Sequence, residues 1–215
     1  MTVVTIRGTM GSGTPEIGRL IAERLHIAYV DREIIAQVAT QIKRPKQDIA
    51  AKEIPPGSLL GRISEALEHN AYSRASAYLP TWELPLEDTQ YLPALESVIK
   101  ELARSGSIVI RGRGSQFILK DFPGALHVLV VAPFELRVKR IMESSKTKEG
   151  ETKKEIENFD RSRRVFTKRY FHADLEDPVN YDLVVNTEKL TFENASSIII
   201  DALSFKGMAY VQNNE

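Results

Sequence analysis

The sequence predicts an α/β protein in which a doubly wound, parallel, five-stranded sheet carries helices on both faces. Two observations support this fold class. Short and almost wholly apolar runs recur along the chain, as expected of strands that are buried on both faces of a parallel sheet. Segments with apolar residues at helical spacing separate these runs, so that strands alternate with helices. Because such sheets bind ligands beyond the carboxyl ends of their strands, the residues directly after each run are the first candidates for a site.

The first predicted strand occupies residues 2–7 and ends at Gly8. A helix is expected to follow it, with Thr14 as the N-cap and Pro15 at the first helical position. Apolar residues at helical spacing predict its buried face. The side chains on that face are Ile17, Leu20, Ile21 and Leu25.

Residues 27–31 are predicted to form the second strand, and residues 32–42 the helix after it. Between residues 43 and 106, charged helical stretches alternate with proline and glycine breakers, which indicates an inserted helical subdomain. An amphipathic helix over residues 91–105 is expected to close this insert and to end at Gly106. Its apolar face consists of Leu95, Val98, Ile99 and Leu102.

Three further strands are predicted in the second half of the chain. They occupy residues 107–111, 126–131 and 181–186, and helical patterns follow them. Residues 146–170 are dense in charge and contain few apolar side chains, so we expect an exposed helical flap there. A helix over residues 192–203 is expected to complete the fold.

The composition limits the classes of function. The chain has 215 residues, of which 42% are hydrophobic, and this content suits one well-buried domain. Lysine plus arginine and aspartate plus glutamate both number 29, so no overall positive charge favours a nucleic acid or an anionic membrane as a partner. The absence of cysteine excludes thiolate chemistry, and no apolar run approaches the roughly 18 residues that a membrane helix needs. We therefore expect a soluble, cytoplasmic protein.

The turn after the first strand has the glycine spacing of a phosphate-binding loop, G-x-x-x-x-G-K-[ST]. In that motif backbone N–H groups and the helix N-terminus face the phosphates. Thr14 stands in place of the lysine, and Pro15 in place of the hydroxyl residue. The alternative is that the glycines merely permit a tight turn. The residues predicted to hold phosphates are Gly8, Gly11, Ser12, Gly13 and Thr14.

Polar and small residues that directly follow other strands are expected to converge on the same edge of the sheet. Besides the loop, these are Asp31, residues 111–114, Asn186 and Thr187. They include cations that can stand in for the missing lysine. A charge-assisted hydrogen bond contributes roughly 1.5–3 kcal/mol, so its loss weakens phosphate binding without abolishing it.

Phosphoryl transfer depends on charge neutralisation, so a catalytic site requires a substitute cation. Arg111 and Arg113 are the leading candidates. Arg7 is a weaker one, because a side chain within a strand is expected to pack on the sheet. Ser12 and Asp31 are candidate magnesium ligands, and the alternative for Asp31 is to cap the helix that starts at Arg32.

Arginine is concentrated in two later segments of the chain. One predicted helix places Arg137 and Arg140 three residues apart, and the charged flap contains Arg161 and Arg163. Guanidinium groups match phosphate oxygens bidentately, which suits a lid that closes over a phosphorylated ligand. The alternative is a solvated helix whose arginines pair with acids at helical spacing, namely Glu155, Glu157 and Asp160.

Taken together, these motifs resemble the cytidylate kinase-like proteins, relatives of bacterial cytidylate kinase among the P-loop nucleoside monophosphate kinases. The matching stretches, in order, are "GSGxxEIG", "YVDREII", "IVIRGRG", "LHVLVVAPFELRVKRIM", "DRSRR" and "YDLVVNT". The resemblance covers roughly residues 2–36 and 107–203. It implies a P-loop kinase-type domain in which residues 43–106 bind the acceptor and residues 146–170 form a basic lid.

The resemblance also implies ATP-dependent phosphoryl transfer to a nucleoside monophosphate such as CMP, with Mg²⁺. By motif match, residues 8–14 would hold the donor phosphates, whereas Asp31, Arg32 and Arg113 would meet the acceptor. The catalytic lid arginines would be Arg137, Arg140, Arg161 and Arg163. Cytidylate kinases proper have the loop lysine and an acid near "GR", where this chain has Thr14 and Arg111.

Two functions of different classes follow from these features. The first is a kinase that binds a nucleotide donor and a small phosphorylated acceptor, and the arginine-rich lid favours it. The second is a non-catalytic nucleotide sensor, and the missing lysine favours it. Magnesium-dependent turnover distinguishes the two. The proline-interrupted insert would also allow a homodimer.

Overall fold

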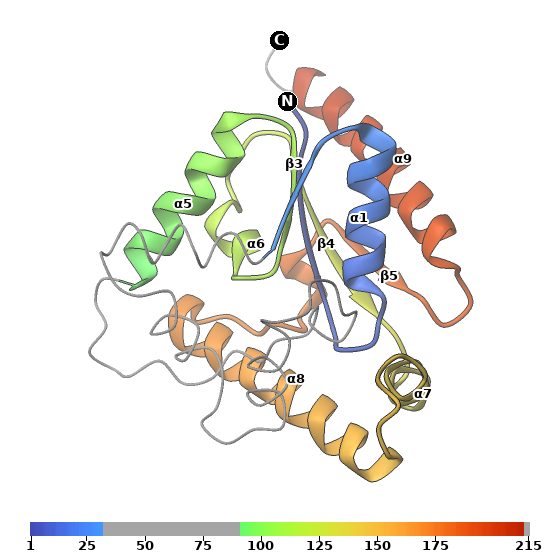
Figure 1. Ribbon diagram of the computed structural model, residues 1–215. Coiled ribbons are helices and arrows are strands. Elements are labelled where there is room, and N and C mark those ends of the chain that lie inside the picture. The colour runs from blue at the N-terminus through green and yellow to red at the C-terminus, as the bar shows by residue number, and fades with distance from the viewer. Residues whose placement is uncertain (32–90, 213–215) are drawn as a thin grey trace, which may run out of the picture. The chain divides into compact units, whose positions relative to one another are not determined.

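The computed structural model describes residues 1–31 and 91–212 (Figure 1). These residues fall into two compact units. The first contains residues 1–31, 95–132 and 177–212, and the second contains residues 91–94 and 133–176. The expected helix at 32–42 and most of the expected insert at 43–106 lie outside the described residues, so a single domain with that insert stays a prediction.

The first unit is built on a five-stranded sheet in which every neighbouring pair of strands is parallel. The order of its strands is β2-β3-β1-β4-β5, which confirms the predicted number of strands and their direction. The strands are β1 (Val3–Gly8), β2 (Ala28–Val30), β3 (Ile108–Arg111), β4 (Ala125–Val131) and β5 (Leu183–Asn186).

Helices cover both faces of this sheet (Figure 1). Helices α1 (Thr14–Leu25) and α9 (Phe192–Gln212) lie side by side on one face. Helices α5 (Tyr91–Ser105) and α6 (Ser115–Ile118) lie on the other face, and a short 3₁₀ helix spans Pro178–Asn180 before β5. These positions confirm the doubly wound arrangement.

The core of the first unit joins β1 to the face covered by α1 and α9. Val4 and Ile6 are fully buried, as expected of alternate residues on one face of a strand. They belong to the same apolar cluster as Ile17, Ile21 and Ile199, which come from the two helices. The helical spacing of Ile17 and Ile21 therefore predicted the buried face of α1 correctly.

The start of α1 differs from the prediction by one residue. Gly13, in the left-handed conformation with φ +88°, is the N-cap, and the helix begins at Thr14 itself. The expected capping role of Thr14 is wrong, because its hydroxyl is paired with Ser12 Oγ at 2.8 Å in the preceding loop. A glycine at the cap allows the sharp turn that brings the chain from β1 into the helix.

The second unit contains α7 (Phe134–Ser145) and the long helix α8 (Glu149–Phe171). The helix predicted over 146–170 is thus present, but it is not exposed throughout. Ile156, Phe159 and Phe166 give α8 a buried face at helical spacing. Phe166 packs against Tyr170, with 4.9 Å between ring centroids. Its role as a lid stays a prediction.

Within the described parts of the chain, no helix combines the length and the apolar character that crossing a bilayer requires.

Candidate phosphate-binding site

The loop between β1 and α1 lies at the point where the strand order reverses. Strand β1 has β3 on one side and β4 on the other, and a parallel sheet binds ligands at the carboxyl end of such a junction. Gly11 and Gly13 have φ angles of +83° and +88°, which side chains disfavour. The Ser12 amide donates to the Thr9 carbonyl at 3.1 Å and so closes a tight turn directly before the helix.

The inside of this loop is lined by two buried hydroxyl groups. Ser12 Oγ and Thr14 Oγ1 form a hydrogen bond of 2.8 Å. Both lie against Gly8, where a Cβ atom would come within 1.8 Å of Thr14 Oγ1 and 2.6 Å of Ser12 Oγ. Where the motif has a lysine, this chain therefore has a short hydroxyl side chain turned back over the first glycine of the loop.

Two residues from the C-terminal part of the chain support the loop from outside. Thr187, directly after β5, is fully buried, and its Oγ1 donates to the Ser12 carbonyl at 2.8 Å. The Phe192 ring lies against Gly13, where a Cβ would be 2.1 Å from Cε1 of that ring. The position of Thr187 after a strand was the signal that placed it at this edge, whereas nothing in the sequence indicated Phe192.

Asp31 and Arg111 form an ion pair at the same edge of the sheet. They follow or end the neighbouring strands β2 and β3, and Arg111 Nη2 lies 2.5 Å from Asp31 Oδ2. Both side chains are largely buried. Near them, burial raises the pKa of Tyr29 to about 12, and the positive charge of Arg111 partly offsets that rise. Asp31 thus supplies an acid beside "GR", although it comes from another strand.

Arg113 lies in a strained turn after β3. It has φ +59°, and the glycines on both sides are also in the left-handed region, at +72° and +70°. A non-glycine residue in this conformation costs of order 1–3 kcal/mol, and such strain is concentrated at functional sites. The Arg113 side chain is buried, and the Gly112 amide donates to the Ile6 carbonyl of β1 at 3.1 Å. The turn is therefore joined to the strand that carries the loop.

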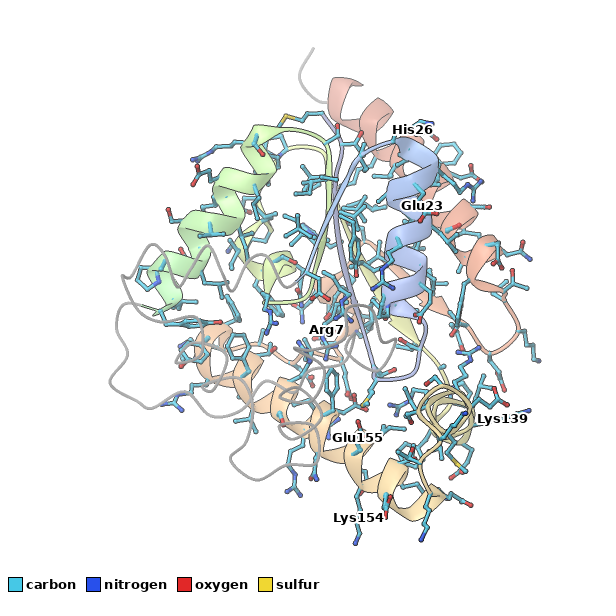
Figure 2. All side chains as sticks on the ribbon, viewed as in Figure 1. Arg7, Glu23, His26, Lys139, Lys154 and Glu155 are labelled. Carbon is cyan, nitrogen blue, oxygen red and sulfur yellow. The ribbon has the colours of Figure 1, made fainter. Side chains whose placement is uncertain are left out.

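Arg7 approaches the loop from within β1. Its guanidinium donates a hydrogen bond from Nη1 to the carbonyl of Gly8, the first residue of the loop. Figure 2 labels Arg7 near the end of β1 where the chain turns into the loop. Arg7 is buried, as expected of a side chain that packs on the sheet. Its guanidinium nevertheless reaches the first residue of the phosphate-binding motif.

The second unit has a polar cavity of its own, of about 410 Å³. A buried ion pair between Arg137 on α7 and Asp160 on α8, 2.7 Å apart, forms part of its wall. Of the predicted lid arginines, Arg161 also lines it, whereas Arg140 and Arg163 do not. The full lining is Phe134, Arg137, Glu157, Asn158, Asp160, Arg161 and Arg164.

The other two predicted lid arginines, Arg140 and Arg163, are half-buried. Arg163 lies over the Phe159 ring, 4.4 Å from its centroid, and Arg140 is half-buried on α7. Asp160, one of the acids that the alternative pairs with arginines at helical spacing, bonds Arg137 of α7. Arg32, the remaining predicted acceptor contact, lies outside the described residues.

The loop fits a magnesium ion only through its hydroxyl groups. Among residues 1–31 and 91–212, no three histidine, aspartate or glutamate side chains cluster so as to hold a metal. Magnesium bound with nucleotide phosphates needs one or two protein oxygens and keeps several waters. Ser12 Oγ suits this demand, whereas Asp31 is already paired with Arg111.

The strand order β2-β3-β1-β4-β5, with a glycine loop between β1 and α1 at the reversal point, fits the P-loop kinase-type α/β fold. The chain belongs to the cytidylate kinase-like family, whose sequence profile matches residues 3–189. That membership supports a nucleotide-kinase-like phosphotransfer function.

Curated relatives match nearly the whole chain at low identity. The cytidylate kinase of Methanosarcina barkeri is 25% identical over 191 residues, which cover 86% of this chain and 87% of the relative. The cytidylate kinase of Archaeoglobus fulgidus is 26% identical over 208 residues, covering 94% and 95%. That of Staphylothermus marinus is 25% identical, covering 93% and 94%.

Solved structures share the fold. An uncharacterized protein from Eubacterium ventriosum superposes with a TM-score of 0.68 at 20% identity, covering 95% of this chain and 99% of that one. A gluconokinase from Sinorhizobium meliloti superposes with a TM-score of 0.51 at 15% identity, covering 98% and 97%. At these identities the likeness concerns the fold alone.

Proposed function

We propose that the protein transfers the terminal phosphoryl group of ATP to a nucleoside monophosphate, with CMP as the leading acceptor. The family supports phosphoryl transfer, and the names of the curated relatives favour cytidylate as the acceptor. The observation that carries the proposal is the buried hydroxyl cradle of residues 8–14 at the start of α1, with Arg113 in a strained turn on the neighbouring strand.

In this assignment the loop binds the donor. Backbone N–H groups of residues 8–14 and the positive end of the α1 dipole would hold its phosphates. The Ser12 hydroxyl would be a ligand of Mg²⁺, which supplies charge neutralisation for the donor phosphates when bound.

The acceptor is assigned to the ends of β2 and β3. Arg113 would bind the phosphate of the monophosphate, and the Asp31–Arg111 pair would border it. Arginine at such a position both orients the acceptor and offsets the charge that develops during in-line transfer. Arg137, Arg140, Arg161 and Arg163 are assigned to a basic lid that excludes water.

A non-catalytic nucleotide sensor is the second candidate, and one specific observation favours it. Thr14 replaces the lysine and its hydroxyl is paired with Ser12, so this position adds no positive charge to the loop. Such a loop would bind a nucleotide through its backbone without accelerating transfer.

Turnover separates the two functions. The assay follows ADP formation from ATP and Mg²⁺ across CMP, UMP, AMP and GMP, with Arg113→Ala and Arg163→Ala beside the wild-type protein. CMP-dependent turnover that both variants lower by at least about tenfold supports the kinase. ATP binding by calorimetry without acceptor-dependent turnover favours the sensor.

A further inference from the structure

We propose that Arg7 supplies the positive charge that a loop lysine gives to the donor phosphates. This rests on the proposed function in one respect, namely that the loop binds a nucleoside triphosphate. It assigns a binding role to a strand residue that precedes the motif.

The first support is the position of the guanidinium. Arg7 is the penultimate residue of β1 and lies in register with Leu129 of β4. Its Nη1 nevertheless donates to the carbonyl of Gly8, so the side chain runs forward along the strand to the loop. Figure 2 shows Arg7 near that end of the strand.

The second support is the face of the sheet from which Arg7 comes. Side chains alternate along a strand, and Ile6 lies in the core shared with α1. Arg7 therefore belongs to the face opposite α1, as does Thr5. A lysine at position 14 would start from α1, so Arg7 would deliver its charge to the same loop from the other face.

The third support is the chemistry of a buried guanidinium. Arg7 is only 8% exposed, and burying a charge is costly unless polar groups or ions compensate it. A guanidinium has several N–H donors in a planar fork, so a bond to Gly8 is compatible with binding phosphate oxygens.

Among the described residues, the other arginines at this edge have different attachments. Arg111 is bonded to Asp31, and Arg113 is held in its own turn after β3. Thr14 carries no charge. Arg7 is bonded to the first residue of the loop, a position that suits a cation for the donor phosphates.

The test is a comparison of nucleotide affinities by calorimetry, and it needs no turnover. ATP and AMP are titrated, with Mg²⁺, into wild-type protein, Arg7→Gln and the matched control Arg104→Gln, an exposed arginine near the end of α5. Arg7→Gln is expected to weaken ATP binding about 10- to 100-fold, as loss of a charge-assisted hydrogen bond does, and AMP binding by less than about threefold. The control is expected to change neither affinity.

A second variant asks whether a lysine in the usual place restores the charge. Arg7→Gln combined with Thr14→Lys should recover at least about tenfold of the lost ATP affinity. If Arg7→Gln fails to fold, the side-chain Nε–Hε signal of Arg7 in ¹⁵N-labelled wild-type protein is followed instead, and it should shift on saturation with ATP but not with AMP.

Three results would overturn the inference. These are ATP affinity unchanged in folded Arg7→Gln, an Arg7 signal that ATP leaves in place, or wild-type protein that binds ATP no more tightly than AMP. Absence of turnover in a protein that still shows the Arg7-dependent gain for ATP would contradict the kinase function alone.

Discussion

The phosphate-binding loop has no room for a side chain at Gly8. A methyl group at Gly8 would collide with Thr14 Oγ1 and Ser12 Oγ and would lie 2.7 Å from the Val130 carbonyl oxygen. The side chains could rotate away, but the backbone of β4 could not. The hydroxyl pair and the missing side chain at Gly8 therefore depend on each other.

Gly8→Ala is accordingly expected to weaken ATP binding at least about tenfold and to lower the free energy of unfolding by about 1–3 kcal/mol, the usual cost of overpacking. Calorimetry and urea unfolding measure the two effects. Gly106→Ala is the matched control, because a Cβ at that position has no heavy atom within 4 Å. Equal ATP affinity in Gly8→Ala and wild-type protein would mean that the loop is not the donor site.

A buried histidine is expected to make the free energy of unfolding depend on pH. His127 bonds Thr5 Oγ1 at 2.8 Å through Nδ1, and its backbone N–H donates to Asp182. Burial lowers the His127 pKa from 6.5, against the attraction of Asp182, which raises it, and with Lys206, which lowers it further. The unfolded chain thus binds this proton more readily than the folded one does.

The contribution of neutral His127 to the free energy of unfolding is therefore expected to be fully present above about pH 6.5. The free energy of unfolding should fall as the pH drops below that value. Urea unfolding at pH 7.5, 6.5 and 5.5 measures the change. His127→Gln should reduce the slope in this range, because Gln does not titrate. An unchanged slope in this variant would show that His127 is not the source of the pH dependence.

The end of strand β5 helps to hold the phosphate-binding loop in place. Thr187 Oγ1 bonds the Ser12 carbonyl and also lies 3.3 Å from the Val131 carbonyl, so β5 is tied to both the loop and β4. This support is expected to strengthen ligand binding, because a loop that is already ordered loses less conformational entropy when its N–H groups bind phosphates.

Thr187→Val keeps the shape of the side chain but removes the donor. We expect ATP binding to weaken by about 3- to 10-fold and the free energy of unfolding to fall by about 1 kcal/mol, the usual value of one buried hydrogen bond. Thr187→Ser retains the hydroxyl and should keep most of the affinity. Calorimetry on both variants is the measurement, and equal losses in the two would contradict the role of the hydroxyl.

Helices α7 and α8 are joined by a charge pair. Removing one partner of a buried ion pair leaves the other charge in a poorly solvated place, at a cost of about 3 kcal/mol. Asp160→Ala is therefore expected to speed hydrogen exchange of the α7 and α8 amides by about 100-fold. Lys154→Ala, an exposed site on α8 labelled in Figure 2, should leave exchange nearly unchanged. Similar protection in both variants would show that the pair contributes little.

Sequence patterns predicted the helices and strands better than the ion pairs that join residues from different elements. Strand runs and helical spacing are local, and they placed β1, α1, α5 and β4 correctly. The contact of Arg111 with Asp31 joins residues 80 positions apart, and Arg137 meets Asp160 across 23. Which charge meets which depends on strand order and helix packing, and neither is a local property. The Gly13 cap has a local cause instead, because the Thr14 hydroxyl is paired with Ser12 two positions earlier.

The order of the strands brings the parts of the candidate site together. The reversal of strand order beside β1 places a glycine loop, a helix N-terminus and Arg113 at one edge of a buried parallel sheet. We propose that this edge transfers a phosphoryl group although its loop has Thr14 in place of lysine. Arg7 would then supply the positive charge that phosphoryl transfer requires and that the loop lacks without a lysine.

The most direct measurement is ³¹P NMR of wild-type protein with ATP, Mg²⁺ and CMP. The prediction is that CDP and ADP appear in equal amounts, at a rate that depends on CMP and rises in proportion to the enzyme concentration. ADP and CDP that stay at the level of a protein-free control, in a sample shown by calorimetry to bind ATP, would contradict phosphoryl transfer by this protein. The loop would then bind a nucleotide without reacting it.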